Sequence, residues 1–447
     1  MAIPLPDEMQ IARSLSAAVQ IPTVSFDENT EKVPFLEMHR LLEKLYPLVH
    51  SRLQKEVINQ FSLLFTWKGA QPDLAAVAFL AHMDVVPAAA NDWTHNPFSG
   101  DIAEGYIWGR GVIDMKCQLI SLLEAVEVLL AAGYQPRRTI FIALGHDEEI
   151  GGRNGARMIA QTLKERGVAL KALLDEGGGV AGGVAPGIKG LIANIAFAEK
   201  SFANIKLEAA ARAGHASMPG RSGAIGILSR AILRLEGRPM PTRLEFVRPT
   251  IQALAPQLPF PFRLVFGNLW LFGWLVQLAL AMEPVTNAML RNTIAPTVLA
   301  GGFKSNVLPG KASVVLNCRL LPGVEVEELL GHIRKTVNDK RVTITCESTN
   351  APSRRPVTIT TPFYADIAAN IENIFPGVPV CPILMVGASD AQHYQAICEL
   401  VYRFQPITFQ TQAEDRTHGV DERIALAQLP VMVNFNARML QAWGSRA

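Results

Sequence analysis

The sequence predicts an α/β fold, a mostly parallel sheet flanked by helices, with a smaller α+β domain inserted into it. The chain has 447 residues, more than one hydrophobic core usually supports, so two domains are expected. Before about residue 200, apolar strand-like segments alternate with longer helix-like ones, as in parallel sheets covered by helices. Beyond that point the pattern changes. We therefore expect one domain at residues 1–200 and 351–447, and the inserted domain at 201–350.

Three buried strands and one long helix define the first domain. The strands are LAAVAFLAHMD, RRTIFIALGHDEE and LKALLDEGG, and each is an apolar stretch that leads into polar residues. The helix is MKCQLISLLEAVEVLLAAG, whose apolar positions recur at helical spacing. Its last residue, Gly133, suits the position after a helix end.

The inserted domain is expected to run in the order strand, helix, two strands, helix, strand. The segments are FANIKLEAAAR, SGAIGILSRAILRLEG, the strand pair around NVLPGKASVVLNCRL, EVEELLGHIRKTVND and RVTITCES. This βαββαβ order is that of a ferredoxin-like unit and is complete enough to form its own domain.

An apolar insertion at about residues 259–283 interrupts this domain. Its uncharged stretch from Leu264 to Met282 has about the length that spans a bilayer. A single crossing would place His82 and His418, which are assigned to one site below, in different compartments. We therefore expect a buried or surface-docked helix and no transmembrane span, with membrane contact as the alternative.

Composition narrows the class of partner to a small molecule or a peptide. The 42 Lys and Arg residues nearly balance the 40 Asp and Glu residues, so no surface for nucleic acid or acidic membranes is indicated. The five cysteines include no CxxC pair, which disfavours a disulfide framework and a thiolate zinc site. The N-terminal stretch lacks a basic segment followed by an apolar one, so we expect no signal peptide and a cytoplasmic location.

Metal-type ligands follow all three strands of the first domain. His82 and Asp84 follow the first strand, residues 146–149 the second, and Asp175 the third. Ligands of open α/β sheets bind beyond the carboxyl ends of the strands. Because side chains alternate along a strand, His82 and Asp84 point to the same side, where the carboxylate can hold the second ring nitrogen of a metal-bound histidine. Each feature alone is more typical of a satisfied histidine, a turn aspartate or a solvated acidic face, and only the combination indicates a site.

A fourth element is WGRGVIDMK, in which glycines set a tight turn and Asp114 stands just before the amphipathic helix. Taken alone, Asp114 is equally well explained as a helix N-cap. Together with the three strand ends, it becomes a candidate bridging carboxylate.

Several stretches resemble metallopeptidase family 20, which includes carboxypeptidase S, glutamate carboxypeptidase and aminoacylase. They are LAHMDVVP, WTHNPFSGDIAEGYIWGRGVIDMK, GHDEEIGG, LDEGG, GHASMP, NVLPGKASVVLNCRLLPG and THGVDER, in that family's order over nearly the whole chain. GHDEE with LDEGG and the apolar insertion look closest to the branch of carboxypeptidase S and the N-acyl-amino-acid hydrolases. The resemblance implies a zinc-exopeptidase-like first domain and a second domain that acts as a lid and forms a homodimer.

The resemblance also implies two zinc ions per subunit, with Co²⁺ or Mn²⁺ as substitutes. Their ligands would be His82, Asp114 and Asp175 for one ion, and Asp114, Glu149 and His418 for the other. Asp84 would orient His82, and Glu148 would be the general base.

A count of charge supports this assignment independently of the family. Two Zn²⁺ ions bring four positive charges and three carboxylates remove three, which favours a bridging hydroxide over water. Glu148 stands next to a ligand without being one, so it can take the proton of that water and deliver it to the leaving amine.

The inserted domain supplies candidate substrate-binding residues. By resemblance, His215 in GHASMP looks like a lid histidine that approaches the reacting carbonyl, often from a partner subunit. Asn306 and Arg319 look like the residues that grip the free carboxylate of the substrate, a role that suits the fork of an arginine. Without the resemblance, His215 would be interpreted as a turn residue and Arg319 as a surface cation.

These observations predict a zinc-dependent carboxypeptidase that hydrolyses an amide next to a free C-terminal carboxylate, through a water bridged by two zinc ions and activated by Glu148. The alternative is an N-acyl-amino-acid amidohydrolase, which would use the same mechanism and for which the apolar insertion could line an acyl pocket. A non-catalytic relative that binds metal or peptide is the remote third reading.

Overall fold

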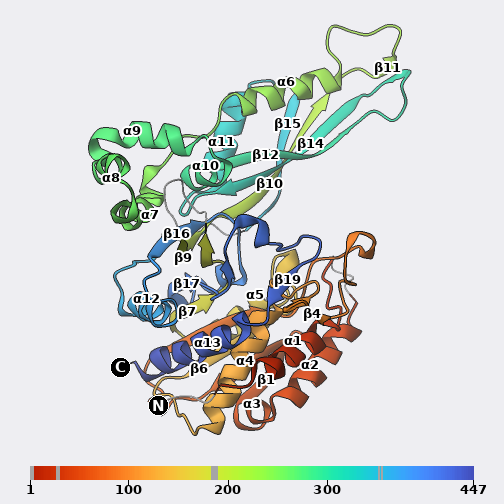
Figure 1. Ribbon diagram of the computed structural model, residues 1–447. Helices are drawn as coiled ribbons and strands as arrows, with labels where there is room; N and C mark the ends of the chain where they lie inside the picture. Colours follow the sequence, from red (N-terminus) through yellow and green to blue (C-terminus); the bar gives the residue numbers. More distant parts are fainter. Residues whose placement is uncertain (1–4, 27–30, 183–189, 351–352, 354–355, 447) are drawn as a thin grey trace. The chain divides into compact units, whose positions relative to one another are not determined.

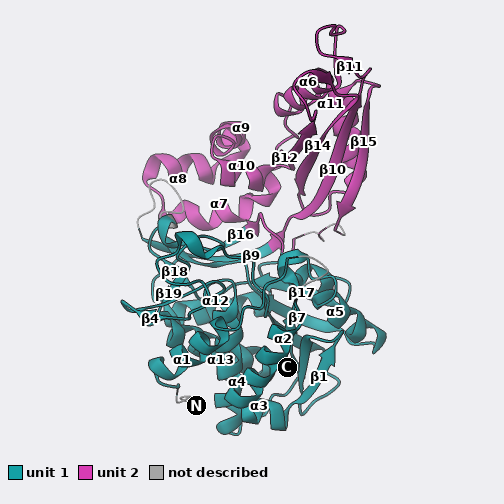
Figure 2. Cartoon of the chain, turned by 90° about the vertical axis from the view of Figure 1, so that its right-hand side faces the viewer, with its two compact units in different colours: residues 1–197, 357–383, 389–447 teal, residues 198–356, 384–388 magenta. Residues whose placement is uncertain are grey.

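The chain forms two compact units, which Figure 2 distinguishes by colour. The computed structural model describes residues 5–26, 31–182, 190–350, 353 and 356–446. Unit 1 comprises residues 1–197, 357–383 and 389–447, and unit 2 comprises residues 198–356 and 384–388. The predicted boundary after residue 200 is close to the observed one, whereas the predicted return at residue 351 lies outside the described residues.

Unit 1 is built on a ten-stranded sheet in the order β1-β2-β6-β3-β7-β17-β9-β8-β18, with β16 also paired to β9. The strands are β1 (Gln54–Ile58), β2 (Ser62–Trp67), β3 (Ala76–His82), β6 (Ile140–Gly145), β7 (Leu170–Asp175), β8 (Gly179–Gly182), β9 (Leu191–Glu199), β16 (Val380–Met385), β17 (Cys398–Arg403) and β18 (Thr408–Phe409). A small separate sheet contains β4 (Ile102–Ala103), β5 (Tyr106–Trp108) and β19 (Arg423–Ala425).

The centre of the large sheet is parallel, and its flanks are mixed. Strands β6, β3, β7 and β17 pair in parallel, whereas β1 and β2 join the edge of β6 in antiparallel pairs. Every residue of β3 and β6 is buried, which explains why both read as continuous apolar stretches. The three strands expected from the sequence are β3, β6 and β7, and the predicted α/β class is confirmed.

Helices flank this sheet (Figure 1). They are α1 (Glu8–Val19), α2 (Val33–Leu45), α3 (Pro47–Arg52), α4 (Lys116–Ala131), α5 (Ala156–Glu165), α12 (Pro362–Ile374) and α13 (Gln428–Ser445). Helix α4 is the predicted long helix, and it is buried along most of its length because α1, α3, α13 and β3 all contact it.

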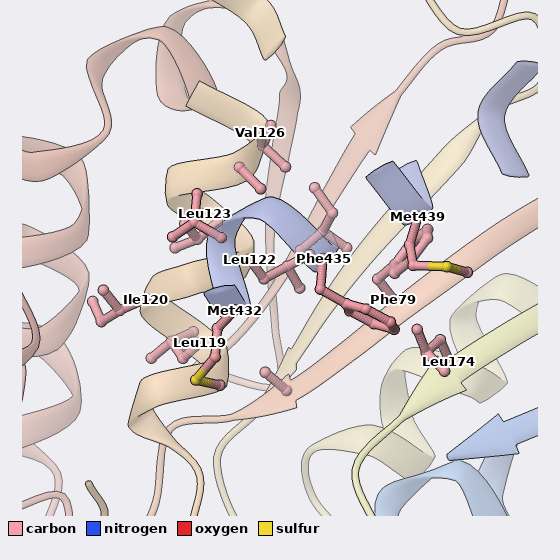
Figure 3. Close-up of a cluster of buried hydrophobic side chains, with 14 of the residues drawn as sticks. Phe79, Leu119, Ile120, Leu122, Leu123, Val126, Leu174, Met432, Phe435 and Met439 are labelled. Carbon is pink, nitrogen blue, oxygen red and sulfur yellow. The ribbon is translucent and has the colours of Figure 1, made fainter. Parts of the chain in front are cut away.

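The core between these elements fixes the sheet against α4 and α13. Figure 3 shows side chains from β3, β7, α4 and α13 that meet there, all of them almost fully buried: Phe79, Leu119, Leu122, Leu123, Leu174, Met432, Phe435 and Met439. Burial of each such side chain contributes about 1.5–3 kcal/mol. This packing holds the carboxyl ends of β3 and β7 in place.

Unit 2 contains a four-stranded antiparallel sheet in the order β12-β14-β10-β15. Its elements follow the predicted βαββαβ order: β10 (Ser201–Ala210), α6 (Ala224–Glu236), β12 (Thr293–Gly301), β14 (Lys311–Leu320), α11 (Val326–Val337) and β15 (Val342–Thr349). A short extra pair joins β11 (Gly214–His215) to β13 (Val307–Leu308). Buried residues alternate strictly along β10, as expected for a sheet with one covered face.

The apolar insertion differs from the single helix that we expected. The chain there forms α7 (Arg248–Leu254), α8 (Phe260–Gly267), α9 (Leu269–Leu280) and α10 (Pro284–Leu290). The break falls at Asn268, whose side-chain amide donates to the Leu264 carbonyl at 2.7 Å and so occupies a helical acceptor. Among the described residues, no single helix combines the length and apolar composition needed to cross a membrane, and α8 and α9 do so only as a pair bent by 110°.

Candidate metal centre

Two groups of imidazole and carboxylate side chains lie at the carboxyl ends of the central strands of unit 1. One group is His82, Asp114 and Glu176, and the other is Asp114, Glu149 and His418. Within each group, one ligand atom from every residue lies within 4.8 Å of the others. Asp114 belongs to both groups, as expected for a carboxylate that bridges two ions.

The parallel order of β6, β3 and β7 brings these residues together. His82 is the last residue of β3, and Glu176 follows the last residue of β7. Glu149 lies in a single 3₁₀ turn, Glu148–Ile150, that follows β6. Because the three strands are neighbours and run in the same direction, their carboxyl ends share one edge of the sheet.

The distances fit a pair of sites that share Asp114. His82 Nε2 lies 3.0 Å from Asp114 Oδ1 and 3.5 Å from Glu176 Oε1. His418 Nε2 lies 3.0 Å from Asp114 Oδ2 and 3.2 Å from Glu149 Oε1. The two oxygens of Asp114 therefore face different histidines. Imidazole and carboxylate groups in this number are the ligands that zinc takes in proteins.

Asp84 is fully buried beside His82. His82 Nδ1 lies 3.0 Å from the Asp84 carbonyl oxygen and 3.3 Å from its carboxylate, which leaves Nε2 as the ligand atom. The same carboxylate accepts hydrogen bonds from the backbone N–H groups of Glu148 and Glu149, both at 3.1 Å. Asp84 thus holds the turn of Glu148 and Glu149 as well as the histidine, and the sequence indicated only the second of these contacts.

Glu422 holds the turn that carries Asp114. Its fully buried carboxylate accepts from the backbone N–H groups of Gly111, Ile113 and Asp114 at 3.1, 2.8 and 3.3 Å. Gly111 has φ +85°, and a Cβ there would lie 2.4 Å from Val85 Cγ1, so this turn requires glycine. Glu422 was not among the residues predicted from the sequence, although it belongs to the matched stretch THGVDER.

Arg110 links this turn to His418. Its guanidinium donates to the Glu422 carboxylate at 2.6 Å and to the His418 carbonyl at 3.0 Å. His418 has φ +61°, in the left-handed region that non-glycine residues seldom adopt. The hydrogen bond from Arg110 therefore holds a strained backbone that aims the imidazole at Asp114.

The third ligand of the first group differs from the sequence prediction. We expected Asp175, but its Oδ2 accepts from the Ala391 N–H at 2.8 Å, and Arg403 and Ser389 also interact with the carboxylate. Successive side chains at a strand end point to opposite sides, so the next residue, Glu176, faces His82 instead. The structure thus corrects the geometry at this position, while the metal role of either residue stays a prediction.

The crowding of carboxylates makes the site attractive to cations. Burial and the Asp114 carboxylate raise the pKa of Glu176 to about 8. Hydrogen bonds with Asp114 and Glu149 raise the pKa of His418 to about 10. Burial alone would lower the pKa of His82, but Glu176 and Asp114 hold it well above its ordinary value. Each shift reports an excess of negative charge that a divalent ion would neutralise.

Glu148 belongs to neither group but lies within electrostatic range of them. Burial raises its pKa well above the ordinary value, and the charges of His82, Glu176 and Asp114 act on it as well. A carboxyl group with a raised pKa next to ligand residues has the properties of a general acid and base.

His146, which the sequence placed among the metal-type ligands, lies in neither group. Its Nδ1 is 2.7 Å from Ser62 Oγ, and its ring packs edge-on against Phe35 and Phe61. It is therefore a satisfied histidine, the simpler of the two interpretations.

The three predicted substrate-binding residues lie in unit 2. His215 pairs with Val307 across β11 and β13, and the Asn306 carbonyl accepts from the Ala216 N–H at 3.0 Å. Arg319 lies near the other end of β14, with its guanidinium over the Phe202 ring.

Arg319 lies eight positions beyond Lys311, where β14 begins, a distance of roughly 27 Å along a strand. Asn306 precedes that beginning, at the β11 end of unit 2 (Figure 1). Asn306 and Arg319 of one chain are thus far apart, so a joint grip on one carboxylate would need one of the two residues from a second chain. Their separate roles towards a substrate stay predictions.

Comparisons with known proteins agree with this fold. The model of peptidase family M20/M25/M40 matches residues 78–442. A Xenopus tropicalis protein named N-fatty-acyl-amino acid synthase/hydrolase PM20D1 is 36% identical over 440 residues, which cover 97% of this chain and 86% of that protein. A probable carboxypeptidase S-like 2 of Dictyostelium discoideum is 35% identical, and the match covers 97% of this chain and 85% of that protein.

Among solved structures, the M20 family metallo-carboxypeptidase Sso-CP2 of Sulfolobus solfataricus superposes with a TM-score of 0.70. The match covers 98% of this chain and 100% of that chain, at 15% identity. At this identity, the likeness concerns the fold alone.

Proposed function

Because the chain belongs to peptidase family M20/M25/M40, a family of metal-dependent hydrolases, we propose that it is a two-zinc amidohydrolase with Glu148 as its general base. The observation that carries the proposal is the pair of ligand groups joined by Asp114. The expected bond is an amide next to a free carboxylate.

The proposed ligands are His82, Asp114 and Glu176 for one ion, and Asp114, Glu149 and His418 for the other. Zinc bound there would supply a Lewis acid that polarises the amide carbonyl and makes water more acidic. Asp84 fixes the His82 ring, and Glu422 fixes the backbone that carries Asp114. These two buried carboxylates act as positioning residues, because they touch ligands and not the substrate.

Glu148 moves the proton. Its raised pKa allows the carboxylate to take a proton from the attacking water and to keep it until the leaving nitrogen needs it. The turn Glu148–Ile150 is held by Asp84 through two backbone N–H groups, so base and ligands share one rigid support. Proton transfer by a positioned group of this kind contributes about a hundredfold to ten-thousandfold to the rate.

Two substrate classes share this chemistry. The relative named as a fatty-acyl-amino acid hydrolase supports N-acyl amino acids, and the carboxypeptidase S-like relative supports peptides. A Danio rerio relative named N-fatty-acyl-amino acid synthase/hydrolase PM20D1.1 is 39% identical over 437 residues, which favours the first class. We therefore propose N-acyl amino acids as the preferred substrates and peptides as the second candidate.

A homodimer through unit 2 is also proposed. Strand β12 is an edge of its sheet, and Val298 and Leu299 on it are exposed. An apolar edge strand of this kind is a natural site for pairing with a second chain. Light scattering on the purified protein would test it, with a monomer at all concentrations as the contrary result.

The test of the proposed function is hydrolysis of a substrate panel by the zinc-loaded protein. The panel contains dipeptides and N-acyl amino acids with short and long acyl chains. We expect turnover of the N-acyl compounds, with a higher kcat/KM for the long chains. Turnover of dipeptides alone would reverse the order of the two classes, and turnover of neither would support a non-catalytic binding protein instead.

A further inference from the structure

Helix α9 exposes its apolar residues and turns its polar residue towards the protein, the reverse of an ordinary surface helix. Its buried residues are Gly273 and Val276. Gln277, the polar residue within Leu269–Leu280, is turned inwards, where its side-chain oxygen accepts a hydrogen bond from the Thr242 hydroxyl. The polar group of α9 is therefore satisfied inside unit 2, and its apolar groups face outwards.

The outward face is broad and contains two tryptophans. Trp270 and Trp274 are 84% and 69% exposed, one helical turn apart, and Leu271, Leu275 and Leu278 lie beside them. At about 100° per residue these positions cover an arc of roughly 140°, opposite to the two buried residues. Scattered apolar residues on a surface need no explanation, but a continuous apolar face of this size marks an interaction site.

Helix α8 also carries exposed apolar side chains. Phe260 and Phe262 are 67% and 51% exposed, and Leu264 is also exposed. We use the name α8–α9 surface for the exposed apolar residues on one side of each helix: Phe260, Leu264, Trp270, Leu271, Trp274, Leu275 and Leu278. Asn268 and Gln277, two polar side chains of these helices, form hydrogen bonds within unit 2. The surface therefore offers few of the polar groups that a protein interface usually pairs.

Local charge differs from the balanced charge of the whole chain. Residues 246–282 contain no Asp or Glu, whereas Arg248 and Arg263 lie in this stretch and are exposed. The overall charge of +2 argued against an acidic membrane surface, but it averages over both units. Glu245 and Glu283 flank this stretch, and residues 243–291 as a whole contain four arginines and two glutamates, a net positive charge that complements anionic lipid headgroups.

We propose that the α8–α9 surface docks onto the surface of an anionic phospholipid bilayer. Helix α9 has 12 residues, or about 18 Å of length, too short for a hydrocarbon core of about 30 Å. The bend of 110° lets α8 and α9 lie in the plane of the interface. Trp270 and Trp274 sit at the headgroup level that indole rings prefer, and Arg248 and Arg263 meet the lipid phosphates.

This inference does not depend on the proposed reaction, because docking is measured without substrate. Docking would have a function if the substrates are N-acyl amino acids with long chains, because these amphiphiles partition into bilayers. Docking would then bring the enzyme to the phase in which its substrate is concentrated.

The test is flotation of the full-length protein with vesicles of phosphatidylcholine, alone or with phosphatidylglycerol. We expect the wild type to float with the mixed vesicles, and W270S/W274S to lose about tenfold or more in vesicle affinity. The matched control is F303S/M218S, because both residues lie in unit 2 and are 85% and 76% exposed, and it should bind as the wild type does. R263Q should lower binding to the mixed vesicles by roughly fivefold.

A second measurement guards against a misfolded variant. Brominated lipids should quench part of the tryptophan fluorescence of the wild type but not that of W270F/W274F, which keeps the apolar character of the surface.

The proposal fails if the wild type does not float with any vesicle. It also fails if both double variants bind alike, or if W270S/W274S splits a dimer without changing flotation, which would make this surface an interface between two copies. An unchanged flotation with a selective loss of long-chain hydrolysis would assign the surface to the substrate pocket.

Discussion

The candidate metal centre of unit 1 buries polar residues, whereas the α8–α9 surface of unit 2 exposes apolar ones. In unit 1, His82 and Asp84 are almost completely buried, although both are polar. In unit 2, Trp270 is 84% exposed, although it is a large apolar residue. Buried charged groups need partners, which His82 and Asp84 find in each other, whereas a large exposed apolar face marks an interaction site.

The two regions are also supported differently. The metal centre is held by hydrogen bonds from elements far apart in the sequence, such as those of Glu422 to the turn before α4. The α8–α9 surface rests on few buried residues, which are Gly273 and Val276 in α9. Changes at the centre should therefore affect metal binding, activity and stability together, whereas changes at the surface should affect docking alone.

Metal removal should give the largest effect. A chelator should reduce hydrolysis of the substrate by at least about a hundredfold, because the polarising charge is lost, and added Zn²⁺ or Co²⁺ should restore it. The rate is measured before and after dialysis against the chelator. Full activity in protein shown by elemental analysis to be metal-free would contradict the account.

The buried support of Asp114 should give the next largest effect. Glu422→Gln leaves the buried Arg110 without its charged partner and should lower the free energy of unfolding by about 3–5 kcal/mol. Glu399→Gln is the matched control, because its ion pair with Lys171 is exposed and worth about 1 kcal/mol or less. Urea unfolding of both variants measures the difference, and equal losses would argue against a special role for Glu422.

Substitutions of the two acids at the end of β7, Asp175 and Glu176, should have different effects. Glu176→Gln should weaken metal binding by about tenfold to a hundredfold, because its carboxylate lies next to His82. Asp175→Asn should lower stability more than metal affinity, because Asp175 accepts from the Ala391 N–H. Competition with a coloured chelator gives the affinities. The reverse pattern would restore Asp175 as the ligand.

Substitutions on the α8–α9 surface should have the smallest effect on stability. W270S/W274S should change the free energy of unfolding by about 0.5 kcal/mol or less, because both side chains are largely exposed. In contrast, Phe435→Ala in the core should cost about 3–5 kcal/mol. A large loss in the surface variant would mean that these tryptophans pack against the protein itself.

The sequence predicted the strands that build the site because burial on both faces leaves a strong apolar signal. Strands β3, β6 and β7 end where their apolar stretches meet polar residues, and four of the five proposed ligands could be found there or in matched motifs. The choice between Asp175 and Glu176 could not be made in the same way. It depends on which side chain the end of the strand turns towards His82, and both residues are acids.

Other features depend on contacts between distant parts of the chain. Glu422 acts on backbone N–H groups more than 300 residues away, and such an interaction leaves no local pattern. The separation of Asn306 and Arg319 follows from the length of β14, which motif matching does not measure. The break at Asn268 depends on one side-chain hydrogen bond, so hydropathy alone predicted one helix instead of two.

We propose that Glu148 transfers protons next to the two ligand groups although it belongs to neither of them. The direct test is Glu148→Gln, with the metal content and the rate of hydrolysis measured on the same preparation. Glu165→Gln, on the exposed side of α5, is the control. The account predicts an unchanged metal content with a rate that falls by about a hundredfold or more, and no change in the control. A rate within a few-fold of the wild type, with the metal retained, would contradict it.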